Sequence, residues 1–130
     1  MKWWVAILAV GAGGAAGSVL RYGLSLAGQR LSISFPHGTL WANILGCLLL
    51  GALTALAAEA GVLSPAARLF WATGLCGGFT TMSTFIYELS RFAQDTEYWL
   101  ASGYFAATLA GCAFAFWAGT LAVRLLALKG

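Results

Sequence analysis

Four apolar stretches, each close to the length needed to cross a bilayer, make up most of this sequence. They cover residues 3–27, 40–58, 67–92 and 99–126. A membrane-spanning helix needs roughly 20 predominantly apolar residues. Only 8% of the 130 residues are charged, whereas a soluble domain carries about 25%. The sequence therefore predicts an all-α, multi-pass protein of the lipid bilayer, in which residues 1–130 form a single domain of four transmembrane helices.

The starts of two predicted helices carry recognisable local signals. Ser64 precedes Pro65, which is typical of a helix N-cap followed by proline at the first helical position. Met1 and Lys2 precede the first apolar stretch, so this stretch could also be a cleavable signal peptide. We expect it to remain as the first helix.

Basic residues are divided almost evenly between the two ends of the predicted helices. Four spans place both termini on one side of the membrane, and cytoplasmic loops normally carry an excess of Lys and Arg. The side of the termini carries Lys2, Arg68, Arg124 and Lys129, and the opposite side carries Arg21, Arg30 and Arg91. This weak bias fits either a fixed orientation or insertion both ways, with antiparallel pairing of two copies. Four helices are too few to surround a pore and still pack, so a homodimer of eight helices is the smallest assembly that could hold one.

Several functional classes lack the residues that they would need. The basic residues are single and scattered, which makes a nucleic-acid surface improbable. Cys47, Cys76 and Cys112 all fall inside predicted spans, where we expect them to be small packing residues rather than disulfides. No His/Cys cluster has the spacing of metal ligands, and His37 stands alone in a predicted loop. The sequence shows no catalytic nucleophile paired with a general base and no nucleotide-binding loop, so we do not expect an enzyme.

Small residues in the first stretch favour close helix packing. The segment GAGGAAGS at 11–18 places Gly13 and Gly17 in a G-x-x-x-G spacing, which permits two helices to approach closely. Such spacings are common in glycine-rich spans, so this motif predicts packing rather than a function.

Polar side chains in the second stretch are functional candidates, because polar groups at membrane depth are costly unless they are paired or face water. Thr39 and Asn43 are four residues apart and share one helical face. Asn43 has both donor and acceptor groups. It could bond a neighbouring helix or line a pore, and its position alone does not decide between the two.

The third stretch contains GLCGGFTTMSTF at 74–85, where glycines and hydroxyl residues interrupt the apolar run. Non-helical backbone at membrane depth is tolerated only where it is buried in protein or lines a water-filled cavity. We expect the helix to break near its centre, which would free carbonyls for a cation and expose a half-helix N-terminus to an anion. A ladder of hydroxyl residues runs from Thr80 to Thr84, and no acidic residue follows before Glu88. Hydroxyls without carboxylates favour an anion path.

Three motifs together resemble the Fluc (CrcB) family of small dual-topology fluoride channels. They are GGAAGSVLRY at 13–22, PHGTLWANILGCLLLG at 36–51 and GLCGGFTTMSTFIYE at 74–88, and the resemblance covers all four spans in order. It implies an antiparallel dual-topology homodimer with two fluoride pores and a structural sodium ion at the centre of the dimer interface.

The resemblance also implies roles for individual residues. The backbone carbonyls of Gly77 and Thr80 from each subunit would hold the sodium ion. Arg21 is similar to the family arginine that ends the first helix. The fluoride pore would be lined by Asn43, Met82, Ser83, Thr84, Phe85 and Tyr104, with Arg21, Thr39 and Glu88 at a vestibule or pore end.

One position departs from the family pattern. The family reads TTFSTF where this chain reads TTMSTF, so Met82 replaces the first phenylalanine and Phe85 is kept. An aromatic ring has a partially positive edge that can face an anion, whereas a thioether sulfur is a weak acceptor. We expect the fold, the dimer and the sodium site to survive while permeation is slowed. The alternative is that Met82 only fills apolar space.

The resemblance implies passive export of cytosolic fluoride across the cell inner membrane. Two other classes remain as alternatives. A small proton-coupled multidrug exporter would need a membrane-embedded acid, typically in the first helix, where this chain has none. A non-transporting assembly subunit would use the polar residues only to bond one helix to another.

Overall fold

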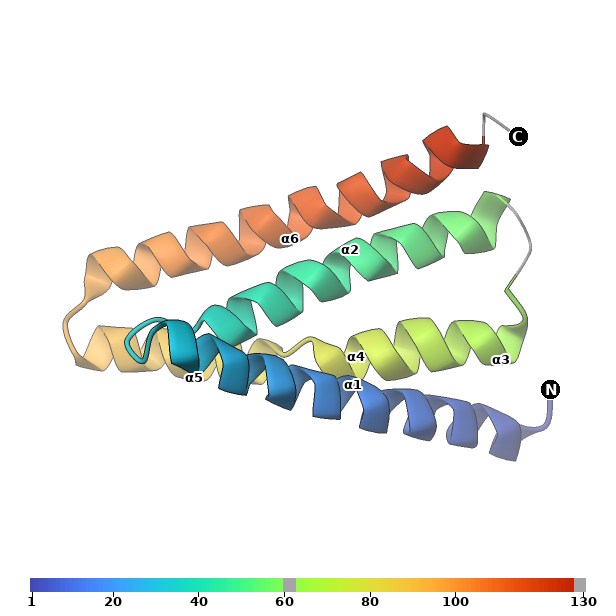
Figure 1. Ribbon diagram of the computed structural model, residues 1–130, viewed down its shortest axis with the longest axis horizontal. Coiled ribbons are helices and arrows are strands. Elements are labelled where there is room, and N and C mark those ends of the chain that lie inside the picture. The colour runs from blue at the N-terminus through green and yellow to red at the C-terminus, as the bar shows by residue number, and fades with distance from the viewer. Residues whose placement is uncertain (60–62, 128–130) are drawn as a thin grey trace.

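The computed structural model describes residues 1–59 and 63–127, and every regular element in these residues is a helix. The elements in chain order are α1 (Trp3–Leu31), α2 (His37–Glu59), α3 (Pro65–Arg68), the π-helix η1 (Leu69–Cys76), α4 (Gly77–Phe79), α5 (Met82–Gln94) and α6 (Tyr98–Ala127). The start of α1 and the last turns of α6 lie at the same end of the molecule (Figure 1). Lys129 lies outside the described residues.

Three of these helices, α1, α2 and α6, are long and apolar enough to cross a membrane. Together with the absence of strands from the described residues, this makes the chain an all-α membrane protein. The segment predicted as the third span, 67–92, is divided among α3, η1, α4 and α5.

Two predicted details of the helix ends are wrong, and one is confirmed. α1 continues to Leu31 rather than ending at residue 27, because the sequence through Gln29 and Arg30 consists mostly of good helix formers. His37 is the first residue of α2 rather than a loop residue. Ser64 caps α3 as predicted: its Oγ accepts a hydrogen bond from the Ala67 N–H at 3.2 Å, and Pro65 begins the helix.

The helical path is interrupted between α4 and α5. Thr80 (φ −82°, ψ 155°) and Thr81 (φ −150°, ψ 116°) are both extended, and Figure 1 shows this short non-helical connection near the middle of the bundle. The Thr81 hydroxyl accepts the Thr84 N–H at 3.2 Å and so caps α5. Thr80 therefore does not belong to the helix that carries Thr84, and the predicted hydroxyl ladder does not run along one continuous helix face.

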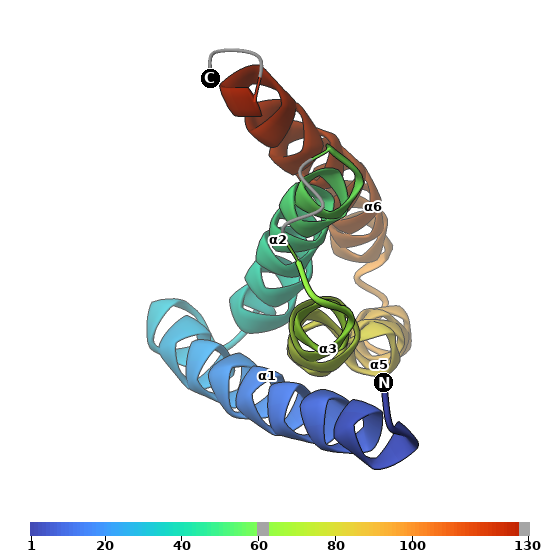
Figure 2. The ribbon, with the colours of Figure 1, turned by 90° about the vertical axis from the view of Figure 1, so that its right-hand side faces the viewer.

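α1 packs backbone to backbone against η1 and α4. The predicted close approach at the G-x-x-x-G motif is confirmed within the chain: a Cβ on Gly13 would stand 2.9 Å from the Leu75 nitrogen, and one on Gly17 would stand 2.8 Å from the Phe79 nitrogen. On the other side of the η1–α4 segment, α2 packs along α6 (Figure 2). The interruption at Thr80–Thr81 therefore lies between α1 on one side and the α2–α6 pair on the other.

Candidate functional site

Asn43 on α2 holds the interruption through both ends of its side-chain amide. Its Nδ2 donates to the carbonyl oxygen of Thr81 at 3.1 Å, and its Oδ1 accepts the Thr81 N–H at 2.7 Å. Asn43 is only 8% exposed. An extended residue inside a membrane protein needs partners for both backbone groups, and a single asparagine supplies both. The side chain therefore bonds a neighbouring segment, and one of its two amide hydrogens remains for a further acceptor.

The interruption also diverts the donors that two carbonyls would have in a continuous helix. In an α-helix the carbonyl of residue i accepts the N–H of residue i+4. The Thr81 N–H, which would serve Gly77, instead donates to Asn43. The Thr84 N–H, which would serve Thr80, instead donates to the Thr81 hydroxyl. Gly77 and Thr80, the pair assigned to sodium by the resemblance, therefore both lose their ordinary helical donor.

Arg21 on α1 reaches the same interruption from the opposite side. Its Nε donates to the carbonyl oxygen of Gly78 at 3.1 Å, and the side chain is half-buried. The expectation that this arginine ends the first helix is wrong, because α1 continues for ten further residues to Leu31, or about 15 Å at 1.5 Å per residue. Arg21 thus places a guanidinium beside the broken helix rather than at the end of α1.

Glu88 joins three helices. Its Oε1 accepts a hydrogen bond from the Thr39 hydroxyl of α2 at 2.7 Å, and its Oε2 accepts one from the Tyr104 hydroxyl of α6 at 2.7 Å. Thr39 is 4% exposed and Tyr104 is 1% exposed. Both oxygens of the carboxylate therefore have a donor, and the three residues form a bonded cluster that joins α2, α5 and α6.

A cavity of about 330 Å³ lies beside the interruption at mid-depth. Among the described residues that line it, none has a charged side chain, and the side-chain donors are an amide, hydroxyls and thiols. Of the eight residues predicted for the pore and the sodium site, five are present in the lining, namely Asn43, Gly77, Thr80, Met82 and Phe85, whereas Ser83, Thr84 and Tyr104 are not. The lining residues with the polar groups or large side chains are Asn43, Cys47, Cys76, Thr80, Thr81, Met82, Phe85, Thr108 and Cys112.

Phe85 and Met82 contribute to this mid-depth cavity in different ways. Phe85 is 1% exposed, and its ring packs edge-on against Tyr104 with centroids 5.1 Å apart. Met82, one helical turn earlier on α5, is 64% exposed. The aromatic ring at 85 is thus fixed in orientation by its neighbours, while the thioether at 82 projects from the subunit.

Thr108 on α6 was not among the residues predicted from the sequence. It is 4% exposed and lines the mid-depth cavity. Within the described part of the chain, its Oγ1 is a buried side-chain oxygen that has no hydrogen-bond partner. Its position four residues after Tyr104 places both on one face of α6, which is the signal that could have identified it.

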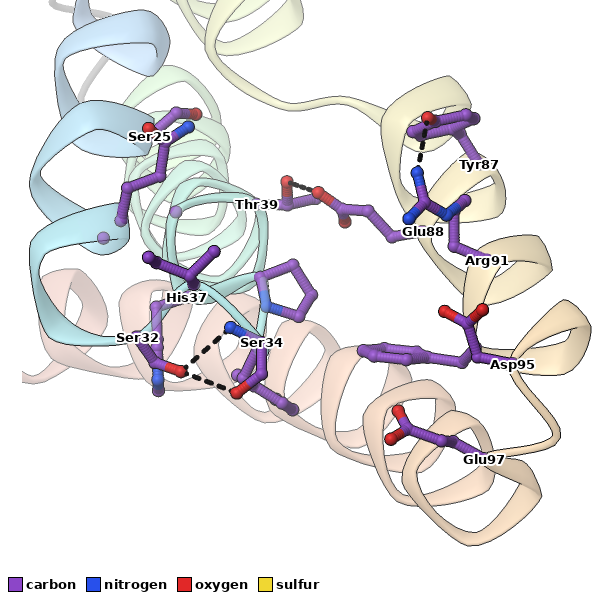
Figure 3. A pocket seen from close by; sticks show the side chains of 17 residues that line it. Ser25, Ser32, Ser34, His37, Thr39, Tyr87, Glu88, Arg91, Asp95 and Glu97 are labelled. Atoms are coloured by element: carbon purple, nitrogen blue, oxygen red, sulfur yellow. Dashed lines mark hydrogen bonds between the residues drawn. The ribbon is translucent and has the colours of Figure 1, made fainter.

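A second, polar cavity of about 420 Å³ lies at the end of the bundle opposite the termini. Thr39 and Glu88 lie between the two walls seen in Figure 3, with Arg91, Asp95 and Glu97 on one side and Ser25 and His37 on the other. Of the residues predicted at a vestibule or pore end, Thr39 and Glu88 line this cavity, and Arg21 does not.

Comparison with known proteins gives a consistent result over most of the chain. The family model described as "CrcB-like protein, Camphor Resistance (CrcB)" matches residues 8–120. The protein named fluoride-specific ion channel FluC of Chlorobaculum tepidum is 46% identical over 119 residues, which cover 92% of this chain and 94% of that protein. Proteins of the same name from Chlorobium luteolum and Sorangium cellulosum are each 42% identical, over 92% and 90% of this chain and 93% of each relative. The chain belongs to the CrcB family.

Proposed function

We propose that this protein is a fluoride channel that lets cytosolic fluoride leave the cell passively across the inner membrane. The observation that supports this most directly is the mid-depth cavity, whose polar lining consists of uncharged donors. The names of the relatives, fluoride-specific ion channel, point in the same direction. A channel of this kind carries out no covalent chemistry, so the proposal is not that of an enzyme.

The donor chemistry suits a small, strongly hydrated anion. Fluoride must replace the hydrogen bonds of water when it enters protein, and amide and hydroxyl groups supply them. Asn43 is held in place by Thr81 and keeps one N–H for an anion. Thr108 offers a buried hydroxyl that has no partner among the described residues. Phe85 adds a ring whose edge carries partial positive charge.

The charge distribution favours this reading over a proton-coupled multidrug exporter. Such an exporter needs an available acid in the membrane, and α1 contains no Asp or Glu. Glu88 is the acid within the predicted third span, and both of its oxygens accept hydrogen bonds from hydroxyl groups. The polar residues also do more than bond helices together, because Thr108 faces a cavity without a bonding partner among the described residues.

An antiparallel homodimer would complete the path. The cavity beside Thr80 and Thr81 lies at membrane depth, and lipid cannot satisfy polar groups there. A second copy could cover it, and the exposed Met82 would then contact that copy. Lys2, Arg68 and Arg124 oppose Arg30 and Arg91 across the bundle, a small bias that permits insertion both ways. Two such subunits would give two pores.

The carbonyls of Gly77 and Thr80 fit a sodium site. Both have lost their ordinary helical donors, and Gly77 is exposed on the surface of the subunit. A pair of these carbonyls from each of two subunits would supply hard oxygen ligands. A bound sodium ion would contribute a fixed positive charge near the anion path, in a region where electrostatic interactions are weakly screened.

Met82 would slow permeation in this scheme. It lines the mid-depth cavity and is exposed, so it stands where the family has an aromatic ring. Its flexible thioether presents a weak acceptor to an anion. Phenylalanine at this position would replace the thioether with a ring whose edge carries partial positive charge, which attracts an anion.

Fluoride efflux from proteoliposomes, measured with an ion-selective electrode, tests the proposal. We expect efflux from the wild-type protein, faster efflux from Met82→Phe, and none from Asn43→Asp, because a carboxylate would repel the anion. Thr54→Val is the matched control on the same helix, since the Thr54 hydroxyl bonds only its own helix at Leu50. If neither the wild type nor Met82→Phe passes fluoride while both remain assembled, the proposed function is wrong.

A further inference from the structure

Three cysteines from three different elements converge on the mid-depth cavity. Cys47 comes from α2, Cys76 from η1 and Cys112 from α6. All three are free thiols. Cys76 is 2% exposed, while Cys47 and Cys112 are partly accessible. The sequence placed each of them in a separate span, and the fold brings all three to the lining of one cavity.

The close packing of α2 and α6 brings two of these thiols together. Along this seam a Cβ on Gly111 would stand 2.9 Å from Ile44 Cδ1, and a Cβ on Gly119 would stand 3.1 Å from the Leu48 carbonyl carbon. Cys112 directly follows Gly111 and Cys47 directly precedes Leu48, so both thiols lie along this contact between α2 and α6, and both line the mid-depth cavity. Cys76 lies on η1, outside this contact between α2 and α6, and is buried.

We propose that Cys47 and Cys112 form a two-coordinate binding site for a soft, thiol-seeking cation of the mercuric type. Each thiol would lose its proton as its sulfur displaces a chloride from the metal: two S–H groups and one HgCl₂ give one S–Hg–S unit, two H⁺ and two Cl⁻, with no change of oxidation state. Thiolate sulfur selects soft metals. The site requires only the two sulfurs, in keeping with the absence, in the described ranges, of any cluster of three or more His, Cys, Asp or Glu side chains suited to a metal.

Hard cations do not match this wall of the cavity. Calcium and magnesium require several oxygen ligands, and the lining residues that the structure describes include no carboxylate. Mercuric chloride is a neutral, linear molecule that enters apolar surroundings, so it can reach thiols inside a membrane protein.

A cation held at this position would obstruct the proposed fluoride path, because Asn43 and Thr108 line the same cavity. This consequence rests on the proposed function, whereas the binding site itself does not. A binding measurement and a flux measurement therefore test the two separately.

The binding experiment titrates purified protein with mercuric chloride and follows the ultraviolet sulfur-to-metal absorption and the release of protons. We expect one Hg²⁺ and two protons per chain for the wild type and for Cys76→Ser. Cys47→Ser and Cys112→Ser each lose a direct ligand, so their affinity should fall by more than the roughly 10–100-fold seen for outer-shell partners. Size-exclusion chromatography, with Cys47→Ala and Cys112→Ala as second variants, verifies that the proteins are folded. Wild-type binding by a folded Cys47 or Cys112 variant, or an equal loss in Cys76→Ser, overturns the site.

The flux experiment adds micromolar mercuric chloride to proteoliposomes and then excess dithiothreitol. Each variant is compared with its own untreated rate. We expect block and recovery for the wild type and Cys76→Ser, and no block for the Cys47→Ser/Cys112→Ser double variant. If mercuric ion binds tightly to both thiols but does not block fluoride flux, the binding site stands, and its proposed position on the fluoride path is wrong. Absence of fluoride flux from every untreated sample would contradict the proposed function and leave the binding result standing.

Discussion

The two halves of the broken third segment are held in place by different means. η1 and α4, residues 69–79, are apolar and lie backbone to backbone against α1, with Gly74 and Gly78 facing Gly13 and Gly14. α5, Met82–Gln94, is amphipathic and is tied to α2 and α6 by side-chain hydrogen bonds at Glu88. One segment of chain thus combines close van der Waals contact with polar bonding, the two main sources of helix association in membranes.

This difference determines how each half responds to change. Where backbones touch, an added methyl group has no space to enter, and the whole helix must move. Where side chains exchange hydrogen bonds, a lost bond can be partly replaced by other partners, and such bonds in membrane proteins average only about 0.6 kcal/mol. The joint between the halves depends on a single residue, Asn43, which bonds both backbone groups of Thr81.

The largest effect is expected in the glycine-packed half. In Gly17→Ala the new methyl group would collide with the Leu75 carbonyl and the Phe79 nitrogen, so α1 must separate from η1 and α4. Overpacking of this kind costs about 3 kcal/mol. The measurement is the apparent melting temperature of the detergent-purified protein. Gly23→Ala is the matched control, because a Cβ there meets no atom within 4 Å. Equal melting temperatures for both variants would show that the backbone contact is unimportant.

An intermediate effect is expected at the joint. Asn43→Ala leaves two backbone groups of the partly buried Thr81, its N–H and its carbonyl, without their side-chain partner. At the lower end of the range for an unsatisfied polar group, about 1 kcal/mol each, the two together cost about 2 kcal/mol. We therefore expect a melting temperature between those of the wild type and Gly17→Ala, together with loss of fluoride efflux. Thr54→Val on the same helix should leave both unchanged. An Asn43→Ala protein with wild-type stability would mean that Thr81 does not depend on this amide.

The smallest effect is expected in the hydrogen-bonded half. Tyr104→Phe removes one of the two donors to Glu88 and keeps the buried ring. The expected cost is about 0.6 kcal/mol and no more than about 1.7 kcal/mol. Tyr87→Phe is the control, because Tyr87 is 58% exposed and lies on the same helix as Glu88. Destabilisation by Tyr104→Phe as large as that of Gly17→Ala would contradict the contrast between the two halves.

Much of the fold could be predicted because it depends on local sequence. Hydropathy over windows of about 20 residues is sufficient to identify membrane-spanning helices, and it placed α1, α2 and α6 within a few residues of their bounds. The Ser64 cap and the close packing at Gly13 and Gly17 follow from motifs of five residues or fewer. The end of α1 was missed because Gly28, a residue type that often follows a helix end, stays helical here and packs against the backbone of Gly38, and the residues after it continue the helix.

The candidate site could be predicted only in part. The amide of Asn43 and the glycines and hydroxyls at 77–81 stand out in an apolar sequence, since polar groups at membrane depth are conspicuous. Thr108 was missed because a single threonine in α6 is unremarkable until its hydroxyl is seen to lack a partner in the described structure. The contact between Arg21 and Gly78 joins residues that are 57 positions apart in the chain, so no local sequence pattern could predict it.

The sequence alone determined that this chain is a membrane protein and which stretches of it form the long helices. It also showed that the third segment carries groups unsuited to a plain lipid-facing helix. These properties follow from hydropathy and backbone chemistry within a few residues. Only the tertiary structure decided which carbonyls lose their helical donors, that Glu88 bonds two other helices, and that Cys47 and Cys112 line one cavity. Those outcomes depend on how closely glycine contacts allow distant helices to approach, which is a property of the packed bundle and not of any single helix.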